Sequence, residues 1–114
     1  MKKLLQILPA GLLLVASGAY AECSRPGSPV VPDGAATTEA ELVDAQTAVK
    51  EFMEGTNAYL ECLAQEEADA PEDEAPEVGS ARIAAHNQAV DDMEVIAEQF
   101  NIAVRAWKAL SAEE

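Results

Sequence analysis

Few residues of this chain have side chains that suit catalysis. His86 is the only histidine, and nucleophilic catalysis needs a nucleophile, a base and an orienting group within reach of one another. Because His86 falls on the apolar stripe of a predicted helix, opposite Tyr59, a hydrogen-bonded polar layer is a simpler interpretation than a catalytic base. The sequence has no C-x-x-C, G-x-x-x-x-G-K-[ST] or G-x-S-x-G motif. We therefore expect no enzymatic activity, no catalytic residue and no cofactor.

Metal binding has two possible sources in the sequence, the cysteines and an acidic run. One histidine and two cysteines are too few for a complete Cys/His site. Residues 66–77 hold seven acids and two prolines, and clustered carboxylates suit a hard cation such as calcium. The run lacks the D-x-[DN]-x-[DN]-G pattern of a calcium loop, so a solvated charged loop is favoured and no metal ligand is predicted. Metal binding or buffering by this loop stays open as the alternative function.

The charge balance restricts the partners that the chain can have. Its 114 residues contain 21 Asp and Glu against 7 Lys and Arg, which gives a formal net charge of −14. Nucleic acids and anionic lipids are polyanions, so non-specific binding to either is excluded. An acidic surface favours cationic partners instead, and we expect the partner to be an unknown protein or another cationic molecule.

The first 21 residues have the plan of a secretory signal peptide. A pair of lysines precedes a mostly apolar stretch, and residues 19–21 read A-Y-A, a typical cleavage site. The apolar stretch is shorter than the ~20 residues that a membrane-spanning helix needs, and Glu22 disfavours lipid attachment at Cys23. We expect cleavage after Ala21 and export to the periplasm as a secreted protein that is not integral to the membrane.

Two stretches have the apolar spacing of long amphipathic helices. The first begins at a capping-box pattern, Thr38-Glu39-Ala40-Glu41, and both show apolar residues at alternating intervals of 3 and 4. We predict a helix over 38–67, an acidic loop over 68–79 and a helix over 80–111. The fold class is then all-α, an antiparallel, coiled-coil-like two-helix hairpin. Its predicted core residues are Leu42, Val49, Phe52, Tyr59, Leu63, Ile83, Val90, Met93, Phe100, Val104 and Trp107.

The proline-rich segment 22–37 should form an extended arm that precedes the hairpin. In an oxidising compartment, the two cysteines of a small exported chain predict one disulfide, Cys23–Cys62. The arm is long enough to reach Cys62, since it spans ~46 Å when polyproline-like against ~36 Å along the helix. An intermolecular disulfide and free thiols are alternatives, and the chain is predicted to be a monomer or a homodimer.

Several motifs resemble those of a group of small exported proteobacterial proteins of uncharacterised function. They are Cys-Ser-Arg-Pro at 23–26, Tyr-Leu-Glu-Cys-Leu at 59–63 and His-Asn at 86–87. The resemblance implies the same arm, cysteine pair and two helices, and it implies no activity and no functional residue. The expected function is that of a non-enzymatic periplasmic protein, an interaction or envelope-associated component.

Overall fold

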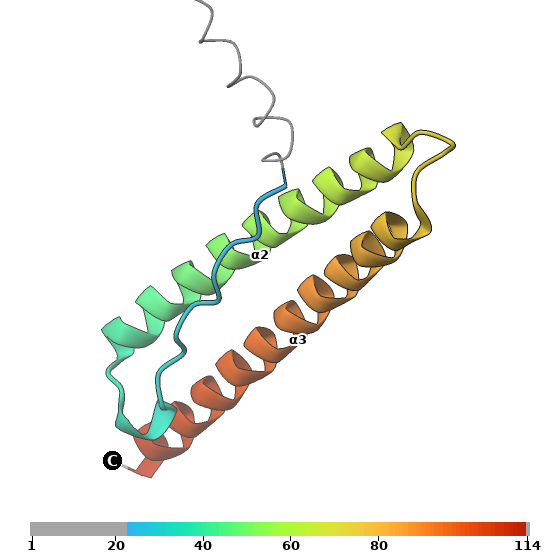
Figure 1. Cartoon of the computed structure of the whole chain (residues 1–114). Helices are drawn as coiled ribbons and strands as arrows, with labels where there is room; N and C mark the ends of the chain where they lie inside the picture. The colour runs from blue at the N-terminus through green and yellow to red at the C-terminus, as the bar shows by residue number, and fades with distance from the viewer. Residues whose placement is uncertain (1–22, 114) are drawn as a thin grey trace, which may run out of the picture.

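The computed structural model describes residues 23–113 as two long antiparallel helices with an extended segment lying along them (Figure 1). Helix α2 spans Glu39–Asp69, helix α3 spans Pro76–Glu113, and a short 3-10 helix, η2, spans Gly34–Ala36. The all-α hairpin predicted from the sequence is confirmed. The predicted signal peptide and its cleavage site lie outside the described residues. Within residues 23–113, neither long helix has the sustained apolar stretch that crossing a membrane requires.

The loop of the hairpin is shorter than predicted because Pro76 begins a helix. The loop occupies residues 70–75 instead of 68–79. Proline suits the first position of a helix, where its missing N–H would have no intrahelical partner. Glu77 in the first turn of α3 is also favourable, since its charge opposes the positive end of the helix dipole. The acidic run therefore divides between the end of α2, a short loop and the start of α3.

The predicted capping box at the start of α2 is present. The Thr38 side chain accepts a hydrogen bond from the Glu41 N–H at 3.1 Å, and the Glu41 carboxylate accepts one from the Thr38 N–H at 3.0 Å. Hydrogen bonds hold the pKa of Glu41 below its ordinary value. The bond from the Thr38 N–H has the largest effect, and the bond from the Thr37 hydroxyl has the next largest. The box therefore stabilises the ionised form of Glu41.

Glu41→Gln is expected to lower the melting temperature at neutral pH, because the amide accepts the same hydrogen bonds without the charge. A carboxyl whose pKa is depressed on folding stabilises the protein above its ordinary pKa and loses this contribution as the pH falls through the folded value. The gap between variant and wild type should therefore close as thermal unfolding is followed from neutral pH to below 4.5. A gap that is the same at every pH would contradict this role for the charge.

The centre of the hairpin is a hydrophobic cluster built by both helices and the arm. Val49, Phe52 and Ile96 are its buried members. The partly buried residues packed against them are Val31 of the arm, Met53, Met93 and Phe100. Phe52 and Met93, both predicted core residues, thus belong to one cluster. Leu42 and Leu63 are also buried, whereas Tyr59, which the stripe places in the core, is half-buried.

Helix α3 buries a different side from the one that its apolar stripe predicts. Its buried residues are Ala89, Ile96 and Ala103, whereas Ile83, predicted to be in the core, is 60% exposed. The other predicted core residues of this helix are half-buried, namely Val90, Met93, Phe100, Val104 and Trp107. The reason is that α3 packs against η2 as well as α2. The most buried line of α3 therefore lies between these two neighbours, and its alanines permit a close approach.

The arm, residues 23–33, lies over the seam between the helices on one side of the hairpin (Figure 1). Pro26 rests on Gly55 of α2, where a Cβ atom would lie 3.2 Å from the proline Cγ. Arg25 reaches the other helix, and its guanidinium lies 3.4 Å from the Asp92 carboxylate. The arm is thus a third, non-helical layer in contact with both helices.

Gly34→Ala is expected to lower the free energy of unfolding by about 1–3 kcal/mol, the usual cost of overfilling a packed site. A Cβ atom at Gly34 would overlap the backbone of Ala103, with the carbonyl carbon only 2.7 Å away. The overlapping atoms of Ala103 belong to the backbone and not to the movable end of a side chain, so η2 would have to move away from α3. Gly27→Ala is the matched control, because nothing lies within 4 Å of a Cβ there. Equal urea midpoints for the two variants would contradict the close packing of Gly34.

Thr56→Val is expected to raise the free energy of unfolding by about 1 kcal/mol, because it removes a buried polar group that has no partner. Thr56 is 1% exposed, and its hydroxyl oxygen has no hydrogen-bond partner among residues 23–113. Valine has nearly the same shape and keeps the branched Cβ. Urea denaturation measures the change, and a less stable variant would show that the hydroxyl does have a partner in the folded protein.

Candidate functional site

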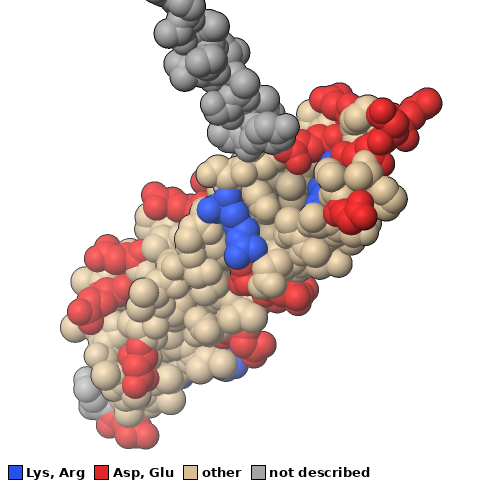
Figure 2. Space-filling view, viewed as in Figure 1, with Lys and Arg blue, Asp and Glu red and all other residues tan. Residues whose placement is uncertain are grey.

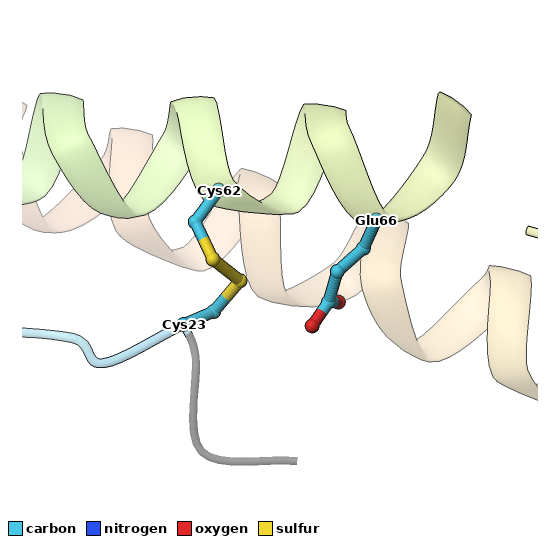
Figure 3. Close-up of side chains that lie close together, drawn as sticks. All are labelled: Cys23, Cys62 and Glu66. Atoms are coloured by element: carbon cyan, nitrogen blue, oxygen red, sulfur yellow. A yellow bond between two sulfur atoms is a disulfide. The ribbon is translucent and has the colours of Figure 1, made fainter. Parts of the chain in front are cut away.

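The Cys23–Cys62 disulfide joins the start of the arm to α2, as Figure 3 shows. The predicted intramolecular pairing is confirmed. The Cα atoms lie 5.4 Å apart, and the two cysteines are separated by 39 residues in the sequence. The bond closes the arm and most of α2 into one covalent loop, so its role in this structure is to hold the arm on the hairpin.

Glu66 lies beside the disulfide, one helical turn beyond Cys62 (Figure 3). Both sulfur atoms and a Glu66 carboxylate oxygen lie within 4.8 Å of one another, a spacing that three metal ligands could have. Metals bind cysteine as the thiolate, and here each sulfur is bonded to the other sulfur. With both sulfur atoms in the disulfide, Glu66 is the one remaining ligand of this group, and we assign no metal site to it.

Arg82 of α3 holds the acidic loop against the hairpin. Its side chain is 12% exposed and pairs with Glu74 of the loop, while its Nε lies 3.9 Å from an oxygen of Glu66 on α2. The hydrogen bond to Glu74 raises the pKa of Arg82 above its ordinary value. One cation thus links α2, the loop and α3. Among residues 23–113, no three carboxylates of the loop converge, so the loop has no preformed calcium site.

A groove of about 530 Å³ lies between α2 and α3 at the end of the hairpin that carries the loop. We name it the loop-end groove. Alanine and glycine residues leave the space between the helices unfilled here. The arm contributes no residue to the lining. The apolar residues of the lining are Leu60, Leu63 and Ile83, and its small residues are Ala64, Ala70 and Gly79.

The loop-end groove faces away from the disulfide. Leu60 of the groove and Cys62 are two residues apart on α2, which separates them by about 160° around the helix axis, with the buried Leu63 between them. The arm, which starts at Cys23, lies on the Cys62 side. Leu60 of the groove and the attachment point of the arm are therefore on different sides of α2.

The polar residues of the loop-end groove are Glu67, Glu74, Arg82 and His86. The predicted polar layer of His86 and Tyr59 is wrong, since His86 is exposed and lines the groove. Because α3 buries the line of Ala89, Ile96 and Ala103, His86 lies on an exposed face, as does Ile83 three residues earlier. The sequence did not predict the groove, although small residues on both of its walls were a signal for it.

Acidic side chains gather at the loop end and in patches along the outer edges of the visible face, whereas basic side chains are few (Figure 2). Two of the arginines are already paired with acids: Arg25 with Asp92, and Arg82 with Glu66 and Glu74. The field around the hairpin is therefore negative, and the basic residues in these pairs are not available to a further anion.

No family model, no curated protein and no solved structure matches this chain. The resemblance to small exported proteobacterial proteins therefore stays a prediction. The function has to be inferred from the geometry and the charge of the hairpin itself.

Proposed function

We propose that this chain is a non-enzymatic, exported component of the cell envelope that binds cationic partners through its acidic surface. The observation that carries the proposal is the charge imbalance, 21 acidic residues against 7 basic ones. Two of those basic residues, Arg25 and Arg82, are already paired with acids. A negative field attracts cationic polypeptides and speeds their association.

The disulfide supports export, because stable disulfides form in oxidising compartments such as the periplasm and are rare in the cytosol. Export with cleavage after Ala21 would remove two lysines and no acid from a chain of charge −14, which leaves −16. The expected mature protein is therefore more acidic than the full chain, and its attraction to cations is stronger.

Binding of a fluorescent oligolysine to the purified, oxidised protein tests the proposal. We expect saturable binding at low ionic strength that weakens steadily as salt is added, because salt screens exposed charges within about 10 Å at 0.1 M. Oligoglutamate of the same length is the control and should not bind. A failure of oligolysine to bind at low salt would contradict the proposal.

Calorimetric titration with calcium distinguishes the alternative, metal binding by the acidic loop. The proposal predicts no saturable calcium binding, because Glu74 is engaged by Arg82 and the loop carboxylates do not converge within the described chain. Saturable binding at low millimolar calcium or below would favour the alternative.

A further inference from the structure

We infer that the loop-end groove is the docking site for an amphipathic cationic segment of a partner polypeptide, which places an apolar side chain in the groove and a lysine or arginine at its acidic rim. The inference rests on the proposed function, since it assumes a cationic partner. It adds the place of contact and the chemical class of the segment that binds there.

Ile83 is the residue that an apolar side chain of the partner would cover. It is 60% exposed, although it shares the groove with Leu60 and Leu63. Removing this apolar surface from water is favourable in proportion to the area covered. Grooves between helices commonly bind an amphipathic segment in this way, with its apolar face turned inward.

Carboxylates at the edge of the groove favour a cationic segment. Glu67 of α2 lines the groove, and the loop that closes this end of the hairpin adds the exposed Glu72 and Asp73. Arg82 is paired with Glu74, so it presents no uncompensated positive charge at the rim. A second copy of this chain, with its own charge of −14, would be repelled here, so charge complementarity favours a cationic polypeptide as the occupant.

The groove is accessible and its walls are fixed before a partner arrives. Neither the arm nor the two cysteines line the groove, so neither has to move. Helix α2 and helix α3 form the two walls, and the Arg82–Glu74 pair ties the loop to α3 beside them. A preformed groove loses little conformational freedom on binding, which favours affinity.

Two synthetic peptides of equal length and equal charge provide the probes. One carries leucines and lysines on opposite faces of a helix, and the other has serine in place of every leucine. If an apolar side chain enters the groove, the leucine–lysine peptide should bind the oxidised protein about tenfold more tightly than the serine–lysine peptide. Fluorescence anisotropy at one fixed ionic strength measures both affinities.

Ile83→Gln and Val95→Gln are the matched pair of variants. Val95 is 52% exposed on the same helix and also lies among acids, but the shallow surface around it is formed by α3 alone. Both substitutions place a good helix former at an exposed position and leave the charge unchanged. Ile83→Gln should weaken the leucine–lysine peptide about tenfold and leave the serine–lysine peptide unchanged, whereas Val95→Gln should change neither affinity. Circular dichroism checks that both variants keep their helices.

The outcomes separate the inference from the proposed function. If the two peptides bind equally and Ile83→Gln has no effect, the groove is not the docking site, but cationic binding stands. If neither peptide binds, the proposed function fails as well. Self-association of the protein without peptide, lost in Ile83→Gln but kept in Val95→Gln, would show that a second copy fills the groove and would overturn the inference.

Discussion

Replacing Phe52 with alanine is expected to lower the free energy of unfolding by about 3–5 kcal/mol, the range for truncating a buried aromatic side chain. Phe52 is 5% exposed and lies in the central cluster with Val49 and Ile96, against which Val31 of the arm also packs. The cavity left by the ring would be bounded by α2, α3 and the arm. A fold with so little core has no other layer to compensate for the loss.

Trp107→Ala and Lys50→Ala are the comparisons for Phe52→Ala. Trp107 is half-buried near the end of α3, so its truncation should cost less, and Lys50 is exposed, so its truncation should stay within about 0.5 kcal/mol of wild type. Urea denaturation, monitored by circular dichroism, gives the free energy of unfolding of all three variants. A cost for Phe52→Ala no larger than that for Lys50→Ala would contradict the hairpin core. A midpoint that rises with protein concentration would instead show a homodimer that buries this stripe between subunits.

Helix α2 was predictable because its signals are local and agree with one another. The capping box specifies its start, and its stripe of apolar residues faces the hairpin core, so Leu42, Val49, Phe52 and Leu63 are buried as predicted. The disulfide was predictable for a similar reason, since two cysteines allow one intramolecular pairing. In each case the sequence pattern and the tertiary contact lead to the same structure.

Helix α3 was only partly predictable because it packs against η2 as well as α2. Its apolar residues recur with a regular period, which predicts a helix, but the period alone does not show that the arm takes one side of it. The contact of Gly34 with the backbone of Ala103 involves no side chain of the arm, so hydropathy gives no signal for it. Which face of α3 is buried, and with it the exposure of Ile83, is set by tertiary packing of this kind.

Removing the disulfide is expected to lower the free energy of unfolding by about 4 kcal/mol. In the chain-entropy model this loss grows with the logarithm of the length of the closed loop, and Cys23 and Cys62 are 39 residues apart. Such a loss is a large share of the 5–15 kcal/mol typical of a native protein. The contact of Val31 in the arm and that of Gly34 in the adjoining η2 remain, so we expect a weakened hairpin from which the first residues of the arm are released.

The double variant Cys23→Ala/Cys62→Ala and the reduced wild-type chain should share one urea midpoint, well below that of the oxidised protein, because both lack the same cross-link. Mass analysis without reductant should find the oxidised chain as a monomer, and a thiol assay should find no free cysteine. A disulfide-linked dimer would contradict the intramolecular bond. If the double variant unfolded at the same urea concentration as the oxidised protein, packing alone would hold the arm. The contact between Gly34 and Ala103 would then be its main anchor, and Gly34→Ala would become the more damaging change.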